Sequence, residues 1–250
     1  MLCNYHTHTK RCRHATGEDR EYVERAIDAG VKILGFSDHA PYIFDDDYYS
    51  YYRMFVHQVE DYVNSVLSLK KEYIKDIDIK LGFELEYYST KHEREMEFLR
   101  QFTPDYIIMG QHFVGGEPGG TYPPCGSGDG FLSKYVDECI EGFKTGDFTY
   151  LAHPDIVGYE FSNKAVDLEF SRLLTFLKEK DIPIELNVLG ITSNRWYSKR
   201  KLFEIAEKVG NKVIIGIDAH SPDAINKSAF TTAKKLIEGL NLNVIDKLNV

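Results

Sequence analysis

The chain has little of what marks secreted, membrane-spanning or nucleic-acid-binding proteins. Its four cysteines have no CxxC spacing, which argues against both a zinc finger and a disulfide framework. No apolar run approaches the roughly 20 residues of a membrane helix. No apolar leader follows a basic start, as a secretory signal would require. We therefore expect a soluble protein of the cytoplasm, with reduced thiols and no membrane partner.

Positive charge is also in deficit. The chain has 30 Lys and Arg residues against 39 Asp and Glu residues, a formal net charge of -9, and it has no basic arm. A nucleic-acid partner is not expected on such a surface. An anionic substrate would need a local source of positive charge, and bound metal ions are one such source.

What the sequence does contain is a regular alternation of short apolar runs with longer segments of helical period. The 250 residues are 43% hydrophobic, which is enough to bury a full core. Seven apolar runs have the length of strands, and each is followed by a predicted helix. We expect strands over residues 2–5, 31–36, 79–83, 106–109, 148–151, 182–186 and 213–217, and helices over about 17–29, 54–74, 91–101, 132–144, 166–180, 202–209 and 223–240.

This alternation is typical of a parallel sheet with helices on its outside. With seven units, closure into a barrel resembling the (β/α)8 fold is the favoured architecture. No repeat or linker marks a domain boundary, so one domain over residues 1–250 is expected. An open doubly wound sheet is the alternative. Against it, no glycine-rich dinucleotide-binding motif follows the first predicted strand.

Histidines gather where the predicted strands end. In an α/β barrel, the C-terminal ends of the strands carry the active site. His6 and His8 leave the first strand side by side, because residues two apart on an extended backbone point the same way. His57 and His92 fall on predicted helices, and we assign both to solvated faces. The seven histidines at or just beyond a strand end are His6, His8, His14, His39, His112, His153 and His220.

Glu84 and Asp218 also follow predicted strands, and together these side chains are too many for one ion. Transition metals take about four to six ligands each, and a carboxylate can bridge two ions, so the set predicts two or three divalent ions. Imidazole ligands favour zinc, iron, manganese or nickel over magnesium and calcium. Three divalent ions offset by two carboxylates leave a charge of about +4, which suits a dianionic phosphate monoester.

The combined motifs resemble the polymerase and histidinol phosphatase (PHP) superfamily over essentially the whole chain. They are His6-x-His8, His14, Asp38-His39, Glu84, His112, His153 and Asp218-x-His220. The segment Cys12-x-His14-Ala15 and the chain length are similar to the histidinol-phosphatase branch. The resemblance implies a distorted (β/α)7 barrel with three metal sites. The first would be held by His6, His8, Glu84 and Asp218, the second by Glu84, His112 and His153, and the third by His14, His39 and His220.

The activity that we expect is hydrolysis of a small phosphate monoester, with L-histidinol phosphate as the substrate. A hydroxide bridging the first two metals would attack phosphorus in line. Asp218 or Asp38 would pass a proton to the leaving group through water, and His220 is a further catalytic candidate. Arg195 is a candidate phosphate contact because a guanidinium can grip two phosphate oxygens. Asn187 either binds substrate or only closes the ring of strand ends.

Several alternatives stay open from the sequence. Asp38 could only orient His39, Glu86 could face solvent beside Glu84, and Arg195 could be a surface residue. Cys12 is taken as inert. The loops over residues 42–52 and 114–130, including Tyr42, Tyr48, Tyr49, Glu117, Tyr122 and Asp129, either hold the ammonium and imidazole of histidinol or are solvated.

Other functions also remain open at this point. The site could cleave another phosphate ester or a nucleotide end. An amidohydrolase-like hydrolase is less favoured, because no lysine lies at a predicted strand end. A non-catalytic metal-binding module is less favoured because the ligand set is complete. The sequence gives no indication of the oligomeric state.

Overall fold

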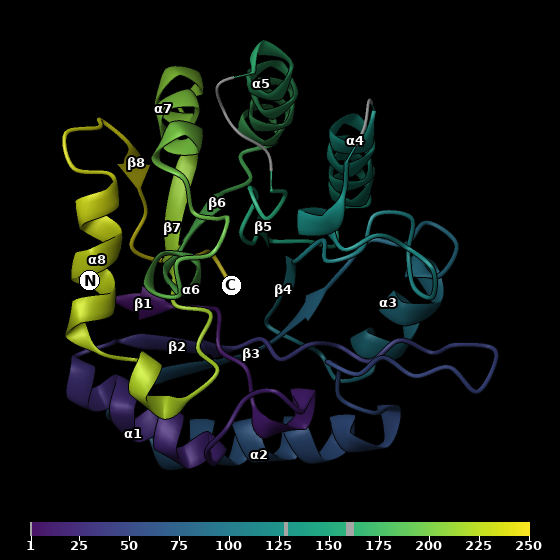
Figure 1. Ribbon diagram of the computed structural model, residues 1–250. Helices are drawn as coiled ribbons and strands as arrows, with labels where there is room; N and C mark the ends of the chain where they lie inside the picture. Colours follow the sequence, from purple (N-terminus) through teal and green to yellow (C-terminus); the bar gives the residue numbers. More distant parts are fainter. Residues whose placement is uncertain (1, 128–129, 159–162) are drawn as a thin grey trace.

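The strands form one curved parallel sheet that follows chain order. A computed structural model of the chain describes residues 2–127, 130–158 and 163–250. In that part of the chain eight strands lie side by side in the order β1 to β8 and curl into a half-barrel (Figure 1). They are β1 (Cys3–Asn4), β2 (Ile33–Phe36), β3 (Asp78–Leu85), β4 (Tyr106–Met109), β5 (Tyr150–Leu151), β6 (Ile184–Asn187), β7 (Lys212–Gly216) and β8 (Asn243–Val244).

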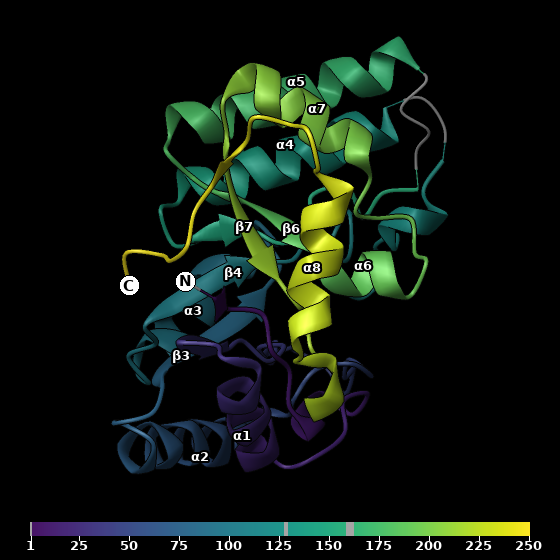
Figure 2. The same ribbon diagram turned by 90° about the vertical axis from the view of Figure 1, so that its left-hand side faces the viewer.

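Helices cover the outside of this sheet. Figure 2 shows α1 and α2 on one side of the molecule and α4, α5 and α7 on the other. None of the helices in the described ranges has the length and hydropathy of a membrane span. The helices are α1 (Asp19–Ala29), α2 (Val59–Glu72), α3 (His92–Arg100), α4 (Phe131–Lys144), α5 (Lys164–Glu179), α6 (Val188–Thr192), α7 (Arg200–Val209) and α8 (Lys227–Leu236).

Local sequence explains why these elements start and stop where they do. Helix α1 begins at a capping box, in which the Glu21 side chain accepts the backbone N–H of Glu18 at 2.6 Å. It ends at Gly30, which adopts φ 79° and donates its N–H to Ala26. Strands β2, β4 and β6 are buried along their whole length, because helices cover the outer face and side chains fill the inside. Because the strands themselves are buried, the side chains that could bind a metal ion lie at the strand ends.

The two ends of the sheet meet directly at the C-terminal ends of the strands. Thr7, just after β1, pairs with Ala219, just after β7. The N–H of His8 donates to the carbonyl of Ala219 at 2.9 Å, and the N–H of Ala219 donates to the carbonyl of His6 at 3.1 Å. Strand β8 pairs only with Lys212 and Val213, at the opposite end of β7. The first and last ligand-bearing segments thereby become neighbours.

The expected fold class, a TIM-like α/β barrel in one domain, is confirmed, and each of the seven predicted strands overlaps an observed one. Strand β8 was not predicted. It has two exposed residues and one partner strand, so it carries no burial pattern. Helix α6 was also missed, because five residues are too few for a periodic signal. Helix α2 begins at Val59 rather than near 54, since residues 56–58 form a 3₁₀ turn.

Candidate active site

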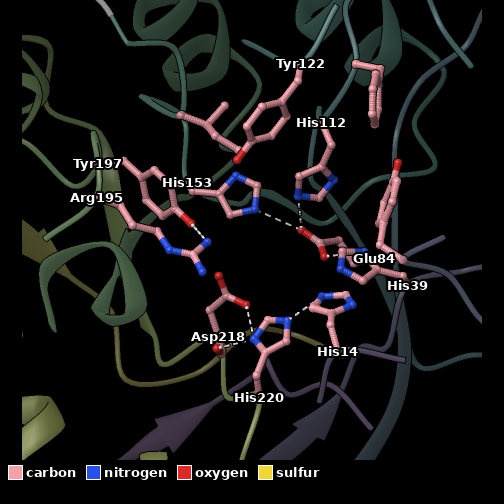
Figure 3. A pocket seen from close by; sticks show the side chains of 13 residues that line it. His14, His39, Glu84, His112, Tyr122, His153, Arg195, Tyr197, Asp218 and His220 are labelled. Atoms are coloured by element: carbon pink, nitrogen blue, oxygen red, sulfur yellow. Dashed lines mark hydrogen bonds and ion pairs between the residues drawn. The ribbon is translucent and has the colours of Figure 1, made fainter. Parts of the chain in front are cut away.

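Side chains from the ends of the strands converge on one pocket, which we call the strand-end pocket (Figure 3). It has a volume of about 200 Å³ and is open to solvent on one side. Seven of the predicted metal ligands lie in its wall, and His6 and His8 are fully buried behind it. The seven are His14, His39, Glu84, His112, His153, Asp218 and His220.

Glu84, at the end of β3, lies at the centre of this group. Its Oε1 is 3.0 Å from Nε2 of His153 and 3.5 Å from Nε2 of His112. Its Oε2 is 3.0 Å from Nδ1 of His39. Burial alone raises the pKa of Glu84, but the imidazoles of His112, His39 and His6 outweigh it, so the pKa lies well below its ordinary value. Glu84 is thus an ionised carboxylate with both oxygens facing imidazoles.

Asp218, just after β7, is the second carboxylate of the pocket. Its Oδ1 is 3.1 Å from Nε2 of His8 and 3.4 Å from Nε2 of His6. Burial raises the pKa of Asp218, and His6, His8 and His220 more than offset it, leaving the pKa well below its ordinary value. Two ionised carboxylates therefore share the imidazoles of His6 and His8 between them.

Hydrogen-bond acceptors behind the rings fix the orientation of the histidines. Nδ1 of His6 lies 2.8 Å from Glu185, and Nδ1 of His112 lies 2.6 Å from Glu86. Backbone carbonyls do the same for two more rings, at 2.9 Å for His14 and 3.0 Å for His220. A proton held on Nδ1 leaves Nε2 with a free lone pair directed inward. This is the orientation of a metal ligand.

The nitrogen and oxygen atoms that point into the pocket are better placed to bind metal ions than to form hydrogen bonds with one another. His39 Nδ1 lies 3.0 Å from Glu84 Oε2 and His8 Nε2 lies 3.1 Å from Asp218, but these contacts lack the direction of a hydrogen bond. Nε2 of His6, Nε2 of His8, Nδ1 of His39 and Oε2 of Glu84 are therefore buried without a hydrogen-bond partner among the described residues. Leaving such atoms unpaired costs about 1–3 kcal/mol each. Nε2 of His14 also faces Nε2 of His220 at 2.9 Å. Donor atoms of several triads lie within 4.8 Å of one another, so the cluster is suited to several divalent ions.

Two of these residues have a strained backbone. His153 has φ 29° and Asp218 has φ 58°, both in the left-handed region that non-glycine residues rarely adopt. Such conformations cost of order 1–3 kcal/mol and persist only where the surroundings enforce them. At both positions the strained backbone directs a side chain into the pocket (Figure 3).

The remaining predicted site residues lie at different depths. Arg195 lines the pocket near Asp218, and its Nη1 donates to the hydroxyl of Tyr197 at 3.1 Å. Asn187 is buried outside the pocket lining, where its Nδ2 donates to Asp218 at 3.1 Å. Asp38 is buried behind His8, with 3.4 Å between Oδ1 and Nδ1. Asn187 and Asp38 thus each contact a predicted ligand, Asp218 and His8 respectively, and their roles toward a substrate stay predictions.

The two long loops contribute aromatic rings to the pocket instead of charges. Tyr52, Phe113 and Tyr122 line it. Glu117 is buried against other loop residues and does not line the pocket. Asp129 lies outside the described residues. The part of the expectation that rested on Glu117 as a contact for an ammonium group is therefore not supported by its position.

Sequence reasoning missed the residues behind the histidines. Glu86 is fully buried, not solvent-facing, because β3 continues to Leu85 and keeps Glu86 on the inner side. The period of two along a longer strand would have been the signal for it. His92 is also not on a solvated face. It is 7% exposed, its Nε2 lies 2.8 Å from Asp147, and its ring stacks on Phe148.

A parallel half-barrel whose strand ends present imidazoles around two ionised carboxylates defines a metal-binding TIM-like barrel protein. The particular family is shown by comparison of sequences. The chain belongs to the PHP domain family, whose model matches residues 4–189. The resemblance stated from the motifs is thereby confirmed.

Known relatives match part or most of the chain in sequence. A probable histidinol-phosphatase from Deinococcus radiodurans is 27% identical over 239 residues, which cover 90% of this chain and 88% of the relative. The histidinol-phosphatase of Bacillus subtilis is 30% identical over 115 residues, 44% of this chain and 43% of that protein. The crystal structure of histidinol phosphate phosphatase from Lactococcus lactis, complexed with zinc, L-histidinol and phosphate, has a TM-score of 0.77 at 18% identity and covers 100% of this chain and 99% of its own. At this identity the structural likeness concerns the fold.

Proposed function

We propose that this protein is a metal-dependent phosphomonoesterase and that its substrate is L-histidinol phosphate, which it hydrolyses to L-histidinol and phosphate. One observation carries the proposal: imidazoles from five strand ends surround Glu84 and Asp218 in and just behind a single pocket that also contains Arg195. Family membership and the names of the relatives support phosphatase chemistry. A cytoplasmic location is part of the same proposal.

The proposed ligands are the nine residues assigned from the motifs: His6, His8, His14, His39, Glu84, His112, His153, Asp218 and His220. When bound there, divalent ions such as zinc, iron or manganese would neutralise charge on the phosphoryl oxygens and lower the pKa of water. Glu84 has both oxygens directed at imidazoles, so it is the natural residue to be shared between two sites. His39 lies between the ligands of the first and the third proposed metal sites, because its ring centroid is 4.4 Å from that of His8 and 5.3 Å from that of His14.

Arg195 is the proposed phosphate contact. Its guanidinium borders the pocket, and Tyr197 accepts one of its N–H groups, which leaves the other donors free to meet phosphate oxygens. Burial raises the pKa of Tyr197 above its ordinary value, so the phenol stays protonated. Arg195 would therefore grip the substrate as a fixed cation with a neutral neighbour.

Asp218 and its neighbours are proposed to control the proton that the leaving group needs. Because the pKa of Asp218 is held well below its ordinary value, the carboxylate would act as an acceptor that orients a water molecule. That water would give a proton to the leaving alkoxide, and the hydroxide that remains would serve as the nucleophile of the next turnover. Asn187 donates to Oδ2 of Asp218 and fixes its plane. His220 contacts Asp218 on the solvent side, with 3.4 Å between Nδ1 and Oδ1.

Tyr52, Phe113 and Tyr122 form one wall of the pocket, which we call the aromatic wall. This wall favours a small, flat leaving group. Tyr52 and Phe113 are stacked, with ring centroids 5.8 Å apart, and Tyr122 lies next to Phe113. Aromatic faces attract both apolar rings and cations. An alcohol that carries an imidazole and an ammonium group matches this wall.

A substrate panel with metal analysis tests the proposal. We expect the metal-loaded protein to hydrolyse L-histidinol phosphate with a higher kcat/KM than glycerol phosphate, phosphotyrosine or a mononucleotide. Amide and lactone substrates are expected to remain intact. Arg195→Met is expected to raise KM with the metal content unchanged. Turnover of another monoester in place of L-histidinol phosphate would overturn the substrate, and turnover of amides alone would overturn the reaction class.

A further inference from the structure

Behind the aromatic wall lies a buried arginine. Arg53 is 1% exposed and stands between two carboxylates, with 2.6 Å from Nη1 to Glu86 and 2.6 Å from Nη2 to Glu117. Its guanidinium also lies over the rings of Tyr42 and Tyr52, at 4.9 Å and 4.6 Å from the ring centroids. A cation so deeply buried is costly unless its partners are fixed, so this arrangement holds all of them in place.

One of the two carboxylates leads to a proposed metal ligand. Glu86 Oε1 lies 2.6 Å from Nδ1 of His112, and Arg53 lies on the other oxygen of the same carboxylate. The contact keeps the Nδ1 proton of His112 away from the pocket and directs Nε2 toward Glu84, which is 3.5 Å away. Acceptors placed behind a ligand histidine in this way tune metal affinity.

The other carboxylate belongs to the loop over residues 114–130, which also carries Tyr122 of the aromatic wall. Glu117 is 4% exposed and accepts hydrogen bonds from Nε of Arg53 at 3.0 Å, Tyr52 at 2.9 Å and Tyr48 at 2.8 Å. Burial raises the pKa of Glu117, but Arg53 and the two hydroxyl groups outweigh it and lower the pKa. Phe113 and Tyr122 lie in the same loop region, so the position of Glu117 constrains the wall.

We propose that Arg53 is a positioning residue that sets two parts of the site at once: the orientation of His112 through Glu86, and the aromatic wall through Glu117. A guanidinium suits this role because its planar fork serves two carboxylates in fixed directions, which a lysine ammonium cannot do. The effect on metal binding is independent of the substrate, whereas the effect on turnover rests on the proposed function.

The test compares four single variants by zinc affinity and by kinetics. Arg53→Lys and Glu86→Gln are expected to weaken binding of one zinc ion by about 10- to 100-fold in chelator competition, with the other ions retained. Glu117→Gln is expected to raise KM several-fold with zinc affinity unchanged. Arg53→Lys is expected to show both effects. Thermal unfolding and circular dichroism of each variant report on the fold.

Arg94→Lys is the matched control. Arg94 pairs with Asp45 of the loop over residues 42–52, and both side chains are exposed. Among the described residues, no hydrogen bond or ion pair links either of them to Arg53 or its two carboxylates. It is expected to match the wild type in zinc affinity and KM. If Arg53→Lys fails to fold, Glu86→Gln decides, since it keeps the side-chain shape. Wild-type zinc affinity in folded Arg53→Lys or in Glu86→Gln would overturn the proposal, whether or not any phosphate ester is turned over.

Discussion

A single carboxylate, Glu84, has imidazole nitrogens within 3.0–3.5 Å on both of its oxygens, from five different rings. Three of these rings direct at it a nitrogen that has no hydrogen-bond partner among the described residues: Nε2 of His6, Nε2 of His8 and Nδ1 of His39. Metal ions would satisfy these atoms because each ion accepts several lone pairs. Because Glu84 faces five of the rings, we expect a substitution of Glu84 to reduce metal binding and turnover more than a substitution of any one histidine.

We expect Glu84→Gln to lose at least two bound ions and at least 100-fold in turnover, because the amide offers one oxygen and no charge. Metal counting on the purified variant, next to wild type, measures this directly. The fold is expected to persist, as shown by circular dichroism. A full metal complement in Glu84→Gln would contradict the central place given to this residue.

A second prediction concerns a buried carboxylate outside the pocket. Glu95 on α3 is fully buried, and its Oε1 accepts the N–H of Ile43 at 2.6 Å. Burial raises its pKa to about 7 from an ordinary 4.5, against the lowering effect of that hydrogen bond and of Arg53. Between these two pH values the folded chain keeps a proton that the unfolded chain releases. Stability should therefore fall as pH rises from 4.5 to 7, then stay level.

Glu95→Gln removes this dependence, because the amide does not ionise. We expect the variant to be more stable than wild type by roughly 1–3 kcal/mol above neutral pH and nearly equal to it in mild acid. Denaturant unfolding of both proteins across that range measures the difference. A difference that does not change with pH would show that Glu95 does not titrate in this window.

At the scale of elements, glycines at the strand ends matter as well as the ligand side chains, because they leave space for neighbouring carboxylates. Gly216, the last residue of β7, lies against Glu185, whose carboxylate is 2.8 Å from Nδ1 of His6. A Cβ at position 216 would overlap Oε1 of Glu185. Gly110, after β4, leaves room for Glu84 in the same way. Small residues on the strands thus admit the carboxylates that organise the histidines.

Gly216→Ala is expected to displace Glu185 and to weaken metal binding by about 10-fold or more, since His6 loses its fixed orientation. The comparison is with Gly30→Ala at the end of α1, where φ is 79° and a Cβ meets nothing within 4 Å. That control should cost about 1 kcal/mol of stability and leave metal affinity unchanged. Equal losses of metal affinity in both variants would mean that general destabilisation, not displacement of Glu185, is responsible.

The elements also show how much of the structure could be predicted from the sequence. The strand over residues 106–109 was predicted with its observed bounds, because a buried strand between clear loops has an unmistakable apolar pattern. Convergence of the histidines followed from their places after strands. The burial of Arg53 and His92 could not be predicted, since partners far along the chain bury them: Glu117 for Arg53 and Asp147 for His92. The burial of Glu86 would have followed from a longer third strand, whose end was predicted two residues too early. Charge alone suggests a surface position for such residues.

For the whole molecule, the unpaired inward atoms predict that metal and stability are linked. A ligand that binds only the folded state stabilises it by about 2.7 kcal/mol at a concentration 100 times its Kd. We expect the unfolding temperature to rise with added zinc and to fall with a chelator, while the secondary structure of the chelated protein persists. Glu84→Gln should show a much smaller rise. An unfolding temperature insensitive to both zinc and chelator would contradict the inferred metal cluster.

The pairing of Thr7 with Ala219 has a consequence for biosynthesis. During translation His6 and His8 are made well before Asp218, which is their neighbour in the folded chain. The segment after β1 therefore lacks this carboxylate until the segment after β7 has been made and has paired with it. Complete metal sites are expected to form only once these two segments are paired.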